Sequence, residues 1–181
     1  MGSYLDSDKI LRCEECGMIF LSEKMIIQNS DDYYSNNRIY GTNLLNPLKL
    51  EIMSENARSV LKLILKYINP ATKKLLDVGA KAGVFVGEAN KIGFDATGIE
   101  LNKNLVEEAR KKGTSLFWGS IEKHTFDYRF DIITLFHVLE HLENPIETIK
   151  KLKENLVESG FLIIEVPNIN SYLAQKDKLS W

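Results

Sequence analysis

The chain has 181 residues, 44% of them hydrophobic and 27% charged, which fits one globular α/β domain with a single buried core. Its formal net charge of −2 lacks the basic surplus of a nucleic-acid-binding protein, and no apolar run approaches the roughly 20 residues of a membrane span. The sequence also lacks the basic start and apolar run of a signal peptide, so we expect a cytoplasmic protein without nucleic-acid or membrane partners.

Residues 1–43 are rich in Asp, Asn, Ser and Tyr and are predicted to form a small N-terminal extension, with a short strand at residues 18–20. Cys13 and Cys16 are separated by two residues in this extension, a spacing that supplies half of a tetrahedral zinc site. The histidines of the chain are poor candidates for the other two ligands, because all of them lie in the second domain.

The second domain is predicted to begin with a helix over residues 47–68. Asn46 can cap this helix, Pro47 suits its first turn, and the pair Asn69-Pro70 is predicted to end it. Apolar residues recur at helical spacing, so one side of the helix is expected to be buried. These residues are Leu48, Ile52, Ala57, Val60, Leu61, Ile64, Leu65 and Ile68.

Short apolar strands and helices then alternate through this domain, which spans residues 44–181. The alternation predicts a doubly wound, mostly parallel sheet with five strands in the order 3-2-1-4-5 and a ligand crevice at their carboxyl ends. Gly93, Gly113 and Gly160 are predicted to adopt left-handed conformations beyond helix ends, and Asn144 is predicted to cap the last helix. The predicted strands are 74–78, 95–100, 116–118, 130–136 and 161–166, and the predicted helices are 83–92, 102–112 and 144–157.

The first of these strands ends in Asp77-Val78-Gly79 and turns through residues 80–83 into a helix. The turn has neither the spacing of a P-loop nor the Gly-x-Gly-x-x-Gly spacing of a dinucleotide-binding loop. A carboxylate such as Asp77 would also repel a pyrophosphate in a cleft of low dielectric constant. The turn therefore favours a cationic ligand over a phosphorylated one.

Glu100 ends the second strand, where an acidic side chain can accept both hydroxyls of a ribose. The alternative is a carboxylate held at the start of the next helix by the helix dipole. Because Asp77 and Gly79 end the neighbouring strand, we favour the ribose interpretation.

The fourth strand and its continuation carry a more specific pattern, which begins at Phe130-Asp131 and ends at Asn144-Pro145. This stretch reads FDIITLFHVLEHLENP and resembles the class I S-adenosylmethionine-dependent methyltransferases, in particular the ubiquinone- and menaquinone-type group. The resemblance covers residues 74–168 and implies a Rossmann-like fold, S-adenosylmethionine as cofactor and methyl transfer to a small-molecule acceptor. The alternatives are a related module that binds cofactor without turnover and a nicotinamide oxidoreductase, against which the first loop argues.

The resemblance also implies which residues contact the cofactor, and this chain departs from the family pattern at two of them. Lys81 stands where many relatives have a glycine, and a lysine with positive φ costs on the order of 1 kcal/mol. Ser120 stands where relatives often have Asp. The implied cofactor-binding residues are Asp77, Gly79, Ala80, Lys81, Gly83, Glu100, Leu101, Gly119, Ser120, Ile121, Phe136 and His137.

His137, Glu140 and His141 have the spacing i, i+3, i+4, so on one helical turn they would share a face. Some relatives bind a divalent ion with Glu-x-x-Glu-His at these positions, and a histidine here can instead serve as a general base. The third interpretation, which we favour, is a structural role in the loop. His137 and His141 are the candidate catalytic residues.

Two further expectations follow from the resemblance. Residues 13–20 resemble the second knuckle of a zinc ribbon that precedes some methyltransferases of this group, with the first knuckle missing, so zinc at Cys13 and Cys16 is a secondary expectation. Residues 169–181 are too few for the last helix and antiparallel strands of the family fold. We therefore expect a C-terminally truncated member, whose fifth strand forms a sheet edge where a second copy of the chain can pair.

Overall fold

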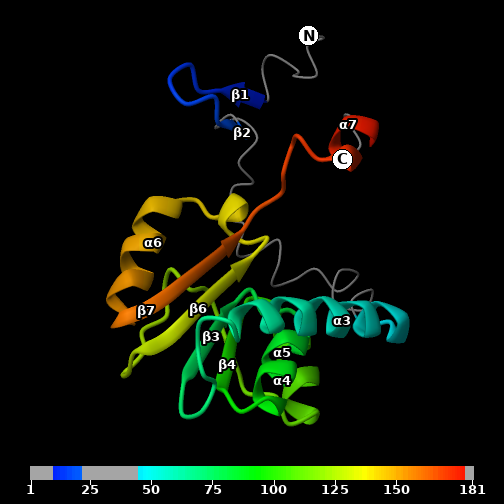
Figure 1. Cartoon of the computed structure of the whole chain (residues 1–181), viewed down its shortest axis with the longest axis vertical. Coiled ribbons are helices and arrows are strands. Elements are labelled where there is room, and N and C mark those ends of the chain that lie inside the picture. Colours follow the sequence, from blue (N-terminus) through cyan, green and yellow to red (C-terminus); the bar gives the residue numbers. More distant parts are fainter. Residues whose placement is uncertain (1–9, 22–44, 178–181) are drawn as a thin grey trace. The chain divides into compact units, whose positions relative to one another are not determined.

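The computed structural model describes residues 10–21 and 45–177, which fall into two units. The smaller unit holds β1 (Ile10–Arg12), the antiparallel β2 (Ile19–Leu21) and α7 (Tyr172–Asp177). The larger unit lies within residues 45–166 (Figure 1). Its elements are α3 (Pro47–Ile64), β3 (Lys74–Val78), α4 (Val84–Lys91), β4 (Asp95–Glu100), α5 (Lys103–Lys111), β5 (Leu116–Trp118), β6 (Phe130–Phe136), a 3-10 helix (Leu139–His141), α6 (Pro145–Glu154) and β7 (Leu156–Glu165).

The strands of the larger unit form a parallel sheet in the order β5-β4-β3-β6-β7. This order confirms the predicted doubly wound topology. All the carboxyl ends meet at one edge of the sheet, and there Asp77 of β3 lies opposite Gly98 of β4 and Thr134 of β6. Among the described residues β7 pairs with β6 alone, so β7 forms the predicted sheet edge.

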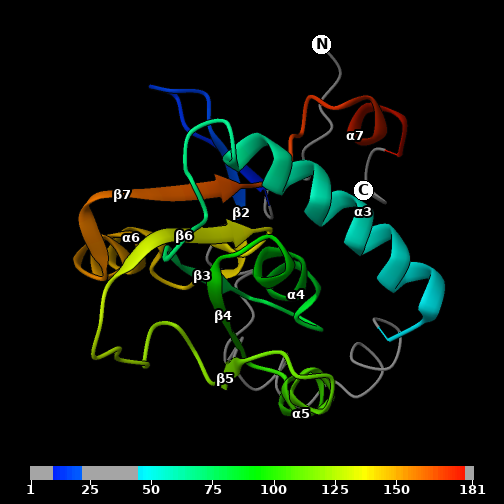
Figure 2. The ribbon, with the colours of Figure 1, turned by 60° about the horizontal axis from the view of Figure 1, so that its bottom comes forward.

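Helices cover both faces of this sheet (Figure 2). Helices α3, α4 and α5 pack on one face through a cluster that includes Leu61, Leu75 and Val86, and α6 packs on the other through Leu152. Leu75 and Leu76 are adjacent in β3 and fully buried, one in each cluster. Because both faces of β3 are covered, its sequence is a continuous apolar run instead of an alternating one.

The end of α6 is where the prediction from the sequence was wrong. The helix stops at Glu154 and β7 already begins at Leu156, whereas the helix was expected to continue to residue 157. Gly160 therefore lies inside β7 and is not a left-handed residue beyond a helix, unlike Gly93 and Gly113, whose φ angles are 101° and 79°. A Cβ on Gly160 would lie 3.2 Å from the carbonyl oxygen of Asp131, so this glycine permits close packing of β7 on β6.

Three smaller differences concern the end of α3, the start of α6 and the position of β2. Asn46 caps α3 as predicted, but the helix ends at Ile64, and the tighter bond from the Tyr67 N–H to the Ile64 carbonyl then turns the chain. The side chain of Asn144 makes no capping bond in the described structure, because its backbone conformation, with ψ of 73°, differs from that of the caps Asn46 and Asn102. The short strand predicted at residues 18–20 is shifted by one residue, to β2. Neither β1 nor α7 was predicted from the sequence.

Candidate functional site at the carboxyl ends of the strands

Asp77 is a buried carboxyl group near the carboxyl end of β3, 4% exposed. The Thr134 hydroxyl on β6 donates a hydrogen bond of 2.7 Å to Asp77 Oδ1. Burial raises the pKa of Asp77 to about 7, although the Thr134 hydrogen bond and the charge of Lys81 act to lower it. A cationic ligand would favour the ionised form, so Asp77 can bind such a ligand and lose its proton in doing so.

Glu100 lies at the tip of the neighbouring strand β4 and is also buried. Its two carboxylate oxygens accept backbone hydrogen bonds of 2.8 Å, one from Lys81 and one from Asn102. Burial raises the pKa of Glu100, against the lowering effect of these two bonds. A carboxylate offers about four acceptor positions, so Glu100 keeps the capacity to accept hydroxyls while it joins the loop after β3 to the start of α5.

The loop after β3 approaches its neighbours so closely that two positions require glycine. Gly79 has φ of 71°, and a Cβ there would lie 2.5 Å from Cγ2 of Val138 in the loop after β6. Gly83 also has φ of 71°, and a Cβ there would lie 2.9 Å from Cγ2 of Thr114. Lys81, between them, adopts φ of 53°, a left-handed conformation that costs a side chain energy.

We expect Lys81→Gly to be more stable than Lys81→Ala by about 1 kcal/mol, because only glycine adopts this φ without strain. Both variants remove the same charge, so their difference isolates the backbone conformation. Urea unfolding at one pH measures it. Equal midpoints for the two variants would show that the positive φ of Lys81 carries no strain.

The ends of β4 and β5 lie side by side at the same edge. The Gly119 N–H donates to the Glu100 carbonyl, and the indole N–H of Trp118 donates to the Leu101 carbonyl, both at 3.0 Å. Ser120 and its neighbour Ile121 are buried next to these bonds. The structure thus brings Leu101 and the segment Gly119 to Ile121, all expected to contact the cofactor, close to Glu100.

The histidine cluster differs from the expected helical face. His137 has φ of 55° and lies outside the 3-10 helix that holds Glu140 and His141. The prediction that the three residues share the face of one helical turn was therefore wrong. Its Nε2 lies 3.0 Å from Oε1 of Glu165 on β7, and its Nδ1 lies 3.7 Å from Oε1 of Glu140. His141 Nε2 lies 3.9 Å from the same Glu140 oxygen. No group of three or more potential ligands among the described residues is arranged to hold a metal ion, so the metal interpretation gains no support.

Cys13 and Cys16 carry free thiols in the turn between β1 and β2. Gly17 has φ of 73°, and its N–H donates to the Cys13 carbonyl, which closes the turn. Hydrogen bonds from the backbone of Cys16 and Glu15 lower the pKa of the Cys13 thiol. Such bonds suit a thiolate, but within residues 10–21 and 45–177 these two cysteines are not joined by a third ligand.

Reasoning from the sequence missed two members of the site, Thr134 and Glu165. Thr134 is the one polar residue within residues 132–136 of β6, a signal that points to a partner inside the sheet. Glu165 ends β7. It is the third acidic residue near the carboxyl end of a strand, after Asp77 on β3 and Glu100 on β4. Phe136 lies beside His137 and packs edge-on against Phe85 of α4, with ring centroids 5.0 Å apart.

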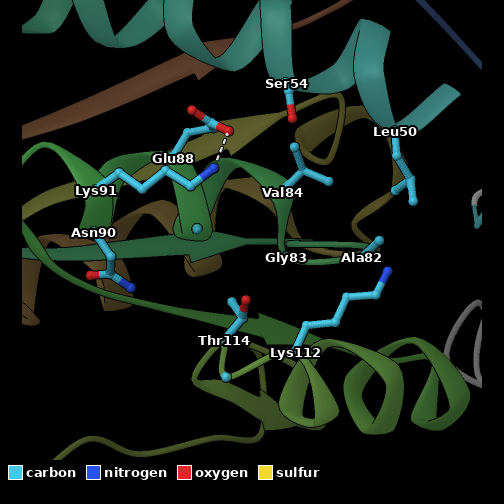
Figure 3. Close-up of a pocket in the computed structure, with 12 residues that line it drawn as sticks. Leu50, Ser54, Ala82, Gly83, Val84, Glu88, Asn90, Lys91, Lys112 and Thr114 are labelled. Carbon is cyan, nitrogen blue, oxygen red and sulfur yellow. Dashed lines mark hydrogen bonds and ion pairs between the residues drawn. The ribbon is translucent and has the colours of Figure 1, made fainter. Parts of the chain in front are cut away.

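A pocket also opens between the helices and the end of the loop after β3 (Figure 3). Its walls come from α3, α4, the segment after α5 and the loop after β3, where the lining includes Gly83, one of the predicted cofactor-binding residues. Glu88 lines it within 2.8 Å of Lys91 and 3.6 Å of Arg58. These ion pairs neutralise the buried carboxylate, so the pocket offers no equivalent of the acidic strand tips.

Comparison with known proteins shows similarity to methyltransferases. A family model described as a methyltransferase domain matches residues 50–181. The ubiquinone biosynthesis O-methyltransferase of Vibrio campbellii (strain ATCC BAA-1116) is 30% identical over 139 residues, which cover 71% of this chain and 55% of that protein. The protein of the same name from Proteus mirabilis (strain HI4320) is 25% identical over 134 residues, or 70% of this chain and 51% of that protein. The chain thus spans about half the length of the curated relatives it matches.

Solved structures show the same fold. The plantazolicin methyltransferase BpumL, in complex with a pentazolic desmethylPZN analogue and SAH, has a TM-score of 0.55 at 21% identity, covering 78% of this chain and 59% of that one. DesVI of Streptomyces venezuelae has a TM-score of 0.52 at 21% identity, covering 63% of this chain and 50% of that one. These similarities establish the Rossmann-like architecture of the larger unit.

Proposed function

Since this chain belongs to the class I methyltransferases, we propose that it binds S-adenosylmethionine and takes part in methyl transfer to a small-molecule acceptor. The observation that carries this proposal is the pair of buried carboxyl groups, Asp77 and Glu100, at the tips of adjacent strands. The cofactor presents an ammonium and a sulfonium together with a ribose diol, and it has no phosphate. Two carboxylates at this edge fit such a ligand and would repel a pyrophosphate.

The remaining expected contacts follow from position along the crevice edge. We assign the methionine end to Asp77 and the loop from Gly79 to Gly83, which includes Ala80 and Lys81. Glu100 would accept the ribose hydroxyls, and the adenine would lie near Leu101 and the segment Gly119 to Ile121. Phe136 and His137 would face the reacting end of the cofactor from β6. All these residues lie at the carboxyl ends of the strands, where open parallel sheets bind ligands.

When bound, the cofactor supplies a methyl group on a cationic sulfur. The protein's own task is then to hold donor and acceptor in line and to exclude water, because positioning alone removes a large part of such a barrier. The curated relatives are named O-methyltransferases, so we propose a hydroxyl as the acceptor group.

Isothermal titration calorimetry with S-adenosylmethionine and S-adenosylhomocysteine tests the proposal, with ATP and NADH as phosphorylated controls. We expect binding of both adenosyl ligands and of neither control. Binding of NADH instead would support the oxidoreductase alternative. Cofactor binding without transfer to any acceptor would support a non-catalytic module, and folded protein that binds none of the four ligands would overturn the cofactor assignment.

The expectations about the location of the protein and its macromolecular partners stay predictions. No described helix is both long and apolar enough to cross a membrane. Cytoplasmic location and the lack of a nucleic-acid partner rest on composition alone. A second copy pairing along β7 is supported by the exposure of Phe161, Ile164 and Val166 on or just beyond this strand, and sedimentation of the purified chain would decide it.

A further inference from the structure

The ends of β4 and β5 are joined by a side chain as well as by the backbone ladder. Glu100 and Trp118 are partners in the register of these parallel strands, and the Gly119 N–H donates to the Glu100 carbonyl at 3.0 Å. One residue further along the chain from Glu100, the Leu101 carbonyl accepts the indole N–H of Trp118, also at 3.0 Å. The indole thus continues the ladder where the backbone after β5 bends at Gly119, whose φ is 143°.

The peptide unit between Leu101 and Asn102 is held at both of its polar groups. Its C=O accepts the indole N–H of Trp118, and its N–H donates to Oε1 of Glu100 at 2.8 Å. The peptide bond is trans, so these two groups point in opposite directions. Rotation of the unit about its flanking bonds would therefore break both hydrogen bonds together. The indole of Trp118 acts on the Glu100 carboxylate through this peptide unit.

Burial alone does not account for a tryptophan at this position, because Trp118 is 53% exposed. A phenylalanine or leucine could supply the apolar contact, whereas the indole also supplies a hydrogen-bond donor. Lys103 begins α5, and its Nζ lies 5.2 Å from the centre of the indole ring, within the range of a cation–π interaction. A cation at the start of a helix is disfavoured by the helix dipole, and the attraction to the ring offsets that cost. The ring is thus held by its hydrogen bond and by Lys103.

We infer that Trp118 is a positioning residue that holds the Glu100 carboxylate in the orientation that accepts the ribose hydroxyls of the cofactor. The inference rests on the proposed binding of S-adenosylmethionine, and it adds a residue outside the expected contacts. The indole hydrogen bond fixes the Leu101–Asn102 peptide unit, and the N–H of that unit orients the carboxylate. Trp118 thereby raises the affinity for the cofactor through Glu100.

Calorimetry with S-adenosylhomocysteine tests this role in the full chain. Trp118→Phe keeps an aromatic ring and removes the donor, and we expect it to weaken binding by about fivefold, the effect of one net hydrogen bond. Tyr128→Phe is the matched control, because it also removes a polar group from a partly exposed ring beside a lysine. Tyr128 lies just before the amino end of β6, so its variant should bind like wild type. Equal affinities of wild type and Trp118→Phe would overturn the inference.

A double-mutant cycle tests whether Trp118 acts through Glu100. If it does, the double variant Trp118→Phe, Glu100→Ala should bind S-adenosylhomocysteine as weakly as Glu100→Ala alone, because the carboxylate that the indole positions is already absent. A further loss of about fivefold in the double variant would mean that the two residues act independently. That result would contradict the positioning role, and so would a loss caused only by general destabilisation.

Hydrogen exchange of the indole N–H gives a readout that a purely structural role would not change. The chain has two tryptophans, so ¹⁵N-tryptophan labelling gives two indole signals, and the one absent from Trp118→Phe belongs to Trp118. A bond that strengthens ligand binding must itself be strengthened by the ligand to the same extent. Saturation with S-adenosylhomocysteine should therefore slow exchange of this N–H by about fivefold. Unchanged exchange would overturn the inference.

The outcomes separate this inference from the proposed function. Wild-type protein that binds S-adenosylhomocysteine, together with a Trp118→Phe variant that binds it equally well, overturns the role of Trp118 and leaves the cofactor assignment standing. Folded wild-type protein that does not bind the ligand, by contrast, contradicts the proposed function itself.

Discussion

Glu100→Ala is expected to weaken binding of S-adenosylhomocysteine by about 100-fold, because two hydrogen bonds to a charged group, each worth roughly 1.5 kcal/mol or more, are lost. The structure makes this position sensitive for a second reason. The same carboxylate accepts the N–H groups of Lys81 and Asn102, so its removal also loosens the loop that contacts the ligand. Calorimetry measures the affinity, and thermal unfolding of each variant shows the temperature range in which it is folded.

Two comparisons separate ribose recognition from loss of loop structure. Glu107→Ala removes an exposed carboxylate from the adjacent helix α5 and should leave the affinity unchanged. An analogue of S-adenosylhomocysteine without the two ribose hydroxyls should lose less affinity on the Glu100→Ala mutation than the parent ligand does, because only the effect of the loosened loop remains. If that analogue loses as much affinity on mutation as the parent ligand does, Glu100 acts only by holding the loop after β3.

Four of the five strands of the parallel sheet, β3 to β6, were predictable to the residue. Charged residues, glycines or a serine lie at or beside most ends of β3, β4, β5 and β6, and strand limits of this kind need no knowledge of the tertiary structure. The boundary between α6 and β7 was not predictable, because Leu156 and Val157 continue the helical spacing and the residue that caps the helix is Asn155 and not a glycine. Local patterns could not decide there between two elements of similar composition.

Only those residues of the site that lie at the ends of single strands could be predicted, and not the contacts between strands. Asp77 and Glu100 could be placed at one edge because parallel topology brings all carboxyl ends together. The Asp77–Thr134 bond joins residues 57 positions apart, and it depends on the register between β3 and β6, which the sequence does not display. The pairing of His137 with Glu165 depends in the same way on the register of β6 with β7.

The ionisation of Asp77 makes a second large effect predictable, the dependence of stability on pH. Its pKa is about 7 in the folded protein against an ordinary value of 3.8, so between these values the folded state holds a proton that the unfolded state has lost. The contribution of this group to the free energy of unfolding is therefore fully present below about pH 4, and it is lost as the pH rises to about 7. We expect Asp77→Asn, which cannot ionise, to be more stable than wild type at pH 8 by a few kcal/mol and to show little difference at pH 4.

Cofactor binding should depend on pH in the opposite direction. A cationic ligand favours ionised Asp77, so between pH 5.5 and 7 the affinity of wild type should rise by up to about tenfold per pH unit and then level off. Asp77→Asn should bind weakly and lack this rise, while any titration of the ligand's own amine affects both proteins equally. Calorimetry in buffers of different ionisation enthalpy should also detect release of one proton on binding to wild type at pH 6. Parallel pH profiles for the two proteins would mean that Asp77 does not meet the cationic end of the ligand, and the acidic strand tip would then serve the fold alone.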